Sequence, residues 1–362
     1  MITPTHFNLY PEHFQRGETP IVQSGTLSAS TFRFASGVCA VRLRSDRAEV
    51  VILPFQGQHI WSAVVDGRNL GWRSMVTEPV ANVPFLATFG GFMQHCGISG
   101  VGGPSADDTH ALHGELPNAP YQEAWIEVGS DAHGEYLGLG GRFHNAIAFT
   151  TDYIAEPLVK LYPSATLFTV EMKVTNQAHT PLELFYLAHV NFLPVDNARL
   201  VYSAPSAGVR VRANIPSHVM ANPDYAALIA DLQANPAQHE TIQPGRMFDP
   251  EVVFLIDYVA DADGWGHTLQ VHPDGGADYV RHRVAELPHV TRWISRTPNQ
   301  DSLAMAEVGT SEPDGAILER KKGNALYLEP GDSFHTSFDV GALPAAEVKS
   351  VVAHVREMVA RG

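Results

Sequence analysis

The sequence predicts an all-β protein, a large antiparallel β sandwich with a few short helices and one helix at the C-terminal end. Most of the 362 residues fall into short apolar or alternating runs, and the 25 prolines lie mainly in the turns between them. Only 17% of the residues are charged, against about 25% in average soluble domains, which excludes a coiled coil and a disordered chain. Helical periodicity is confined to two segments.

The first predicted strands lie in the N-terminal part of the chain. Residues 38–44 alternate in part between apolar and polar side chains, and residues 48–54 form an apolar run that ends at a proline. Residues 57–68 indicate a strand that closes with Asp66 and Gly67, a residue pair typical of tight hairpin turns.

Strand patterns continue to the C-terminal end. Residues 165–176 alternate over about ten positions, which is the pattern of a half-buried antiparallel strand. Further strands are predicted at residues 182–192, 252–259, 267–272, 325–328 and 334–340.

Two segments have helical spacing instead. Residues 224–233 carry an apolar stripe, and residues 343–360 carry five valines on one side and open with Pro344. We therefore expect a single domain over residues 1–362, with a helical insert at about 216–245 and a C-terminal helix at about 343–360.

The glycine-rich stretch of residues 90–120 fits no ordinary pair of strands. Long irregular segments in compact domains are usually functional, so we expect a functional loop here. His110 and His113 in this stretch could bind a metal ion together, but scattered histidines more often make loop hydrogen bonds. We therefore expect no metal ion at these histidines.

Charge and cysteine content limit the partners. The net charge is −15, from 24 basic and 39 acidic residues, which argues against nucleic-acid binding and favours a neutral or polar substrate. Cys39 and Cys96 are too few for a disulfide scaffold, and no apolar run is long enough to cross a membrane. The expectation is a cytoplasmic protein with a small-molecule substrate, and a homodimer is left open.

Three segments carry side chains suited to acid–base chemistry. The glycine-rich stretch contains His113 within a Leu-His-Gly string, a predicted strand contains His189 and Asn191, and Glu307 precedes a Pro-Gly-Asp turn. Each residue also has a purely structural interpretation: His189 as a core histidine, Glu307 as a solvent-facing strand residue and His113 as a loop residue. Only their order along the chain favours a common site.

In this order the segments resemble the aldose 1-epimerase (galactose mutarotase-like) superfamily over about residues 30–342. The strings at residues 96–98 and 101–104 are similar to those of a divergent branch of that superfamily. Other features depart from the better-known members: Glu115 stands where a second glycine is usual, and the expected arginine segment is missing.

The resemblance implies a β supersandwich and the interconversion of sugar anomers without a cofactor. That reaction removes a proton from the C1 hydroxyl and delivers one to the ring oxygen, so it needs a base and an acid that titrate near neutral pH. By resemblance Glu307 is the base, His189 is the acid, and His113 stabilises the developing charge or holds the ring oxygen.

Further side chains are candidates for binding the sugar. Asn191 follows His189 in its string, and Asp249 and Glu251 can accept paired hydrogen bonds from a diol, although a role in a turn or cap fits both carboxylates equally well. Two other groups complete the set. Arg73 and Arg292 are candidates to replace the missing arginine. Trp61, Trp265 and Trp293 are candidates for stacking on the sugar, although two of these three tryptophans are expected to belong to the core.

Two other functions stay open on the same scaffold. One is a non-catalytic carbohydrate-binding or regulatory protein, because a fold does not determine a function. The other is a sugar isomerase or lyase that uses the same acid–base pair.

Overall fold

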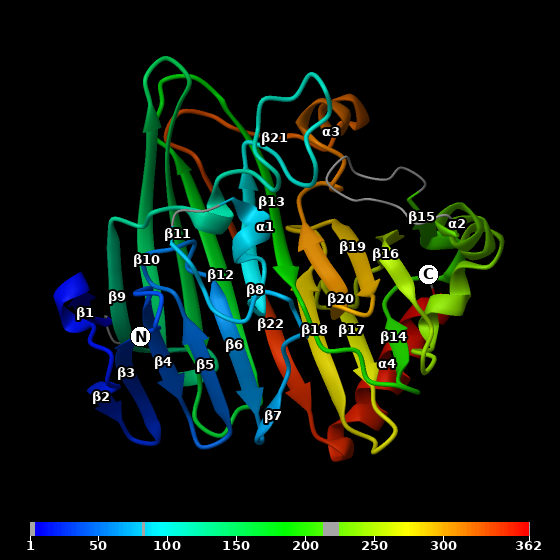
Figure 1. The fold of residues 1–362 in the computed structure, drawn as a ribbon, viewed down its shortest axis with the longest axis horizontal. Helices are drawn as coiled ribbons and strands as arrows, with labels where there is room; N and C mark the ends of the chain where they lie inside the picture. The colour runs from blue at the N-terminus through cyan, green and yellow to red at the C-terminus, as the bar shows by residue number, and fades with distance from the viewer. Residues whose placement is uncertain (1–3, 82–83, 213–223, 362) are drawn as a thin grey trace.

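The computed structural model describes residues 4–81, 84–212 and 224–361. In these residues two large antiparallel sheets pack face to face, and the strands of both layers run roughly across the long axis of the molecule (Figure 1). The predicted all-β sandwich is therefore confirmed.

The smaller sheet has nine strands. Its strands, in spatial order, are β1 (Thr5–Leu9), β9 (Glu123–Asp131), β10 (Gly134–Ile147), β11 (Thr151–Leu161), β12 (Leu167–Asn176), β22 (Ser333–Leu343), β18 (Ala277–Arg283), β17 (Trp265–Val271) and β14 (Arg199–Tyr202). Strand β22, near the C-terminal end of the chain, thus joins the two halves of this sheet.

The larger sheet has thirteen strands. Its strands, in spatial order, are β15 (Val209–Val211), β16 (Phe248–Asp257), β19 (His289–Arg296), β20 (Asp301–Gly309), β13 (Leu182–Val190), β8 (Met93–Ile98), β6 (Ile60–Val65), β5 (Ala48–Ile52), β4 (Cys39–Arg44), β3 (Leu27–Arg33) and β2 (Thr19–Ser24), with β21 (Leu326–Leu328) beside β13 and β7 (Arg68–Asn69) beside β6.

The main core lies between the two sheets. Ala188 and Val190 of β13 belong to the same buried cluster as Val170 of β12. The ring of Phe92, just before β8, lies 6.3 Å from the ring of Phe168 of β12. Because successive strand residues point to opposite faces, the residues between those core positions face away from the smaller sheet. That outward face of the larger sheet carries the candidate site.

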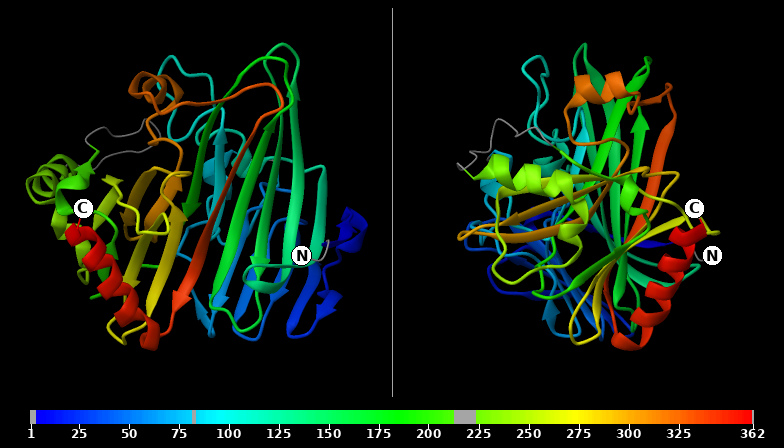
Figure 2. Two further views of the ribbon diagram at one scale, coloured as in Figure 1. Left: turned by 180° about the vertical axis from the view of Figure 1, so that it is seen from behind. Right: turned by 90° about the vertical axis from the view of Figure 1, so that its right-hand side faces the viewer.

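Short helices and one long helix lie on the outside of the sandwich. The four α-helices are α1 (Phe85–Thr88), α2 (Tyr225–Ala234), α3 (Ala316–Lys322) and α4 (Ala345–Arg361), and the 3₁₀ helices are η1 (Pro11–His13), η2 (Leu116–Asn118), η3 (Ser206–Gly208) and η4 (Pro236–Glu240). Helix α4 runs along the outside of the smaller sheet, where Val348 and Val355 pack against Leu269 and Tyr279 (Figure 2). None of the described helices is long and apolar enough to cross a membrane.

The predicted helical insert is described only in part, and the glycine-rich stretch differs from the prediction. Of the predicted helical insert, residues 213–223 lie outside the described residues, and the remainder holds α2 and η4. The interpretation of the glycine-rich stretch as loop throughout is wrong, because β8 is a buried central strand. Gly97 has a φ of +117°, and a Cβ there would lie 2.0 Å from the carbonyl oxygen of Phe185, so glycine here permits close strand packing.

Candidate functional site

A cavity of about 440 Å³ opens on the outward face of the larger sheet. Its floor comes from β13, β20, β19 and β16, and its walls come from α1 and the loop between β8 and η2. Carboxylates, histidines, one arginine and several aromatic rings line it, a combination suited to a small polar ligand with an apolar face.

His189 and Glu307 meet on the floor of the cavity. The register pairs Ala188 with Val308, and its next step places His189 of β13 opposite Glu307 of β20. His189 Nδ1 lies 3.0 Å from Glu307 Oε1, and both side chains are buried. Neither atom has a hydrogen bond of standard geometry with any described residue, so both retain bonding capacity for a ligand.

His113 reaches the same floor from the glycine-rich loop. Its amide donates to the carbonyl of Gly102 at 3.0 Å, its carbonyl accepts from the amide of Gly97 at 2.9 Å, and its φ is +60°. The amide of Gly102 also donates to His113 Nδ1 at 3.4 Å, so a neutral His113 ring carries its proton on Nε2. The His113 and His189 rings are 5.3 Å apart, edge to face.

Two glycines fix where this loop lies. Gly102 has a φ of +73°, and a Cβ there would be 1.9 Å from the carbonyl oxygen of Pro313. Gly114 has a φ of +75°, and a Cβ there would be 2.4 Å from the carbonyl oxygen of Gly97. The loop therefore packs backbone against backbone on its neighbours, which holds His113 over the strands.

Aromatic rings surround the two histidines. Phe89 and Trp293 lie 5.0 Å and 5.6 Å from the His189 ring, each with an edge-to-face orientation. Phe85 lies 4.8 Å from the His113 ring. This wall limits water around the acid–base groups and offers flat faces on which a sugar ring can stack.

A second carboxylate in the cavity already has partners. Arg212 Nη2 donates to Glu251 Oε1 at 3.1 Å, and the indole Nε1 of Trp293 donates to Glu251 Oε2 at 2.7 Å. Arg212 Nη1 also lies 3.9 Å from Asp314 Oδ1. The charge of Arg212 is thus balanced by these carboxylates, while Glu307 adds a further negative charge nearby.

Cys96 lies on the central strand β8, next to β13, and is fully buried. Burial, and then the nearby Glu307 carboxylate, raises the pKa of the Cys96 thiol well above its usual range. The thiol therefore stays protonated and packs as a small apolar group rather than serving as a nucleophile.

The structure brings five of the nine predicted site residues into one cavity: His113, His189, Glu251, Trp293 and Glu307. Four others lie elsewhere. Arg73 is exposed outside the cavity lining, Asn191 is fully buried, Asp249 does not line the cavity, and Arg292 is fully buried and donates to the carbonyl of Met305 at 3.0 Å.

The remaining tryptophans and His110 are also away from the cavity. Trp61 packs against Phe34, and the Trp265 ring lies under Arg283 at 3.8 Å. His110 Nε2 accepts from the amide of Ala316 at 3.3 Å and lines a different cavity from His113, so the two histidines are not a pair of metal ligands. Among the described residues two clusters have the spacing of metal ligands, one of Asp261, His267 and His354 and one of Glu312, Asp314 and Glu319. Neither cluster contains His189 or Glu307.

Sequence reasoning missed several polar residues of the cavity, among them Arg212 and Thr291. Thr291 is paired with Glu307 across β19 and β20, and its Oγ1 has no hydrogen-bond partner in the described part of the chain. It stands two positions before Trp293, so strand alternation from that tryptophan could have found it. Arg212 follows the alternating run of β15, and no comparable spacing linked it to the histidines.

The fold of this protein is galactose mutarotase-like, as the sequence resemblance indicated. Residues 35–342 match the family described as "Domain of unknown function (DUF4432)", and the chain belongs to that family. No curated protein matches the chain in sequence.

Solved structures share the fold. A Klebsiella pneumoniae protein described as a "putative aldose 1-epimerase" has a TM-score of 0.82 and 21% identity, over 99% of this chain and 96% of its own. A galactose mutarotase-like protein of Clostridium acetobutylicum has a TM-score of 0.60 and 12% identity, over 88% of this chain and 99% of its own. At such identities the likeness shows the fold.

Proposed function

We propose that this protein interconverts the anomers of an uncharged sugar, with Glu307 as the base and His189 as the acid. The observation that carries the proposal is the 3.0 Å approach of His189 Nδ1 to Glu307 Oε1 on the floor of a cavity walled by aromatic rings. The two oxygens that exchange protons in this reaction are both bonded to C1 of the sugar. An acid and a base that lie side by side therefore suit it.

The proposed reaction balances without a cofactor. Glu307 takes the proton of the C1 hydroxyl, and His189 donates a proton to the ring oxygen as the bond from C1 to that oxygen breaks. The open-chain aldehyde turns about the bond between C1 and C2. The ring oxygen then attacks the other face of C1, His189 regains its proton from the ring oxygen, and Glu307 returns its proton to the C1 oxygen.

The rest of the cavity supports the same proposal. His113, with its proton on Nε2, is suited to donate a hydrogen bond to a sugar oxygen, and Thr291 Oγ1 is a further polar contact. Trp293 and Phe89 offer a stacking surface. Since Arg212 is balanced by Glu251, we expect a neutral sugar to be preferred over a sugar phosphate.

The test is Glu307→Gln, assayed by NMR exchange spectroscopy or polarimetry on a panel of neutral aldoses and one sugar phosphate. The amide keeps the shape of the side chain but cannot accept the proton, so anomer exchange should fall by at least about 10²-fold while sugar binding persists. The matched control is Glu127→Gln, because Glu127 is buried and also pairs with a histidine, His6, at 2.9 Å, away from the cavity.

Two outcomes would contradict the proposal. One is near-normal exchange in folded Glu307→Gln. The other is a wild-type protein that binds a sugar of the panel without accelerating its exchange, which would favour the carbohydrate-binding alternative.

A further inference from the structure

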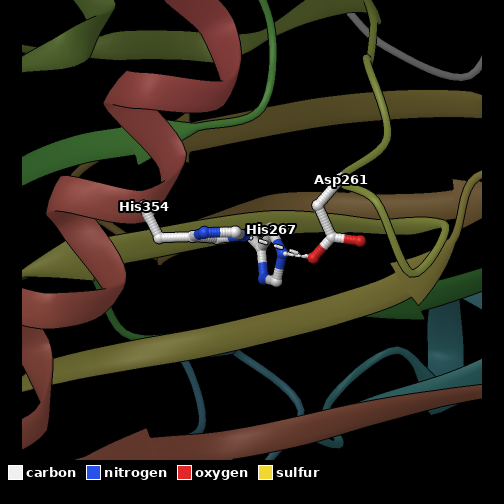
Figure 3. Close-up of side chains that lie close together, drawn as sticks. All are labelled: Asp261, His267 and His354. Atoms are coloured by element: carbon white, nitrogen blue, oxygen red, sulfur yellow. Dashed lines mark hydrogen bonds and ion pairs between the residues drawn. The ribbon is translucent and has the colours of Figure 1, made fainter.

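A second group of polar side chains lies where the C-terminal helix meets the smaller sheet. Asp261 comes from the loop between β16 and β17, His267 from β17 and His354 from α4 (Figure 3). His267 Nε2 and His354 Nε2 lie 3.0 Å and 3.2 Å from the same carboxylate oxygen, Asp261 Oδ2. Three potential ligand atoms from three separate segments thus converge.

The spacing of these atoms suits a transition-metal ion. The three ligand atoms all lie within 4.8 Å of one another. Zinc bonds to imidazole nitrogen and carboxylate oxygen are about 2.0–2.2 Å long, so tetrahedral ligands stand roughly 3.3–3.5 Å apart. The two distances to Asp261 Oδ2 are already close to that separation, and small side-chain rotations would complete it.

Neighbouring groups hold two of the ligands in place. Asp261 Oδ1 accepts from the amides of Asp263 and Trp265, both at 2.9 Å, which turns Oδ2 toward the histidines. The hydroxyl of Tyr279 lies 2.6 Å from His267 Nδ1 and can fix that ring with Nε2 free of a proton. Outer partners of this kind are typical of metal-ligating histidines and carboxylates.

The surroundings leave room for further ligands. A cavity of about 250 Å³ borders Asp261 and His354, and the side chain of His354 is 51% exposed, so water can complete the coordination. The cluster of Glu312, Asp314 and Glu319 differs because a cationic side chain already occupies it. There the ammonium of Lys322 lies 2.6–2.7 Å from Glu312, Asp314 and Glu319 and takes the place of a cation.

We propose that Asp261, His267 and His354 bind one divalent transition-metal ion, with Zn²⁺ as the first choice. Two imidazoles and a carboxylate form a donor set that zinc accepts. The ion fastens α4 to β17, in addition to the valine contacts of that helix. This site is separate from the cavity of His189 and Glu307.

The experiment is calorimetric titration of the full-length chain, treated with chelator and desalted, with zinc chloride. Wild type should bind one Zn²⁺ per chain, and zinc should raise its melting temperature because the ion binds the folded state. His354→Ala should weaken zinc binding by at least about tenfold. Loss of a residue that only hydrogen-bonds to a metal ligand already costs about that much affinity, and His354 is itself a proposed ligand. His354 is half exposed, so this variant is expected to fold.

The matched control is His144→Ala. His144 is also 51% exposed and also contacts one carboxylate, Asp152, at 2.7 Å, but it lies on another part of the smaller sheet. This variant should bind zinc as wild type does. Failure of wild type to bind a stoichiometric zinc ion, or equal binding by wild type and His354→Ala, would overturn the proposal.

Discussion

His189 and Glu307 lie opposite each other on neighbouring strands, and their burial has a physical cost. Buried polar atoms in folded proteins nearly always have hydrogen-bond partners, because an unmade bond costs about 1–3 kcal/mol. The facing Nδ1 and Oε1 atoms approach to 3.0 Å without standard hydrogen-bond geometry. A purely structural pair would be expected to complete that bond. The missing hydrogen bonds of these two atoms, on the floor of a cavity, are better explained by a ligand that bonds to them.

Replacement of the two histidines separates their roles. If His189 delivers the proton to the ring oxygen, it acts mainly in the transition state, so His189→Asn should lower kcat with little change in KM. If His113 holds the ground state from the loop, His113→Asn should lower kcat and also raise KM. Steady-state kinetics on both variants, with circular dichroism as a control of folding, makes this measurement.

The result that would contradict these roles is specific. If His189→Asn keeps full activity per folded molecule and only loses stability, then His189 is a core histidine. If His113→Asn leaves KM unchanged, the loop does not hold the substrate.

At the scale of elements, the predictable features were those with a local cause. The alternating run at residues 165–176 is β12, and the segment at residues 343–360 with valines on one face is α4. In each segment the spacing of the apolar residues matches the side chains that a strand or a helix places on one face. β8 was missed since Gly97 looks like a loop residue in sequence. Its close contact with β13 exists only once the strands are paired.

The site was predictable only in part. Sequence order pointed to His113, His189 and Glu307, which now lie together. The cavity arginine is Arg212 rather than Arg292, because only the pairing of β15 with β16 brings that part of the chain to the cavity. No local pattern carries that information.

The loop that carries His113 has no room for a methyl group at Gly102. Gly102→Ala should lower activity and raise KM, because the added Cβ would be 1.9 Å from the Pro313 carbonyl and must displace the loop. The matched control is Gly245→Ala, which has a similar φ of +70° but nothing within 4 Å of the new Cβ. The control should lose only the roughly 1–2 kcal/mol of a left-handed alanine and keep its kinetics.

Urea unfolding and steady-state kinetics on both variants make the comparison. Equal kinetics for the two alanine variants would mean that the position of this loop does not matter for the substrate.

For the molecule as a whole, buried histidines tie stability to pH. Burial lowers the pKa of His59, His95, His239 and His282 to about 3. The ordinary value of an unfolded histidine is about 6.5. Between about pH 6.5 and pH 3 the unfolded chain therefore binds protons that the folded chain does not, and folding stability falls as the pH falls.

The size of this effect is large for a protein of this kind. Each fully shifted histidine contributes a slope of about 1.4 kcal/mol per pH unit. Four of them would remove a typical stability of about 5–15 kcal/mol within roughly one to three pH units. The folding stability should therefore fall steeply as the pH drops below about 6.5.

His282→Leu tests this account at one position. His282 is fully buried on β18, and neither ring nitrogen has a hydrogen-bond partner among the described residues, so leucine removes an ionisable group without breaking a bond. The variant should gain about 2 kcal/mol over wild type on going from pH 7 to pH 5, since the unfolded variant lacks the histidine whose protonation stabilises the unfolded wild type. Urea unfolding midpoints at both pH values measure the difference. Parallel losses of stability in the two proteins would show that the acid sensitivity arises elsewhere.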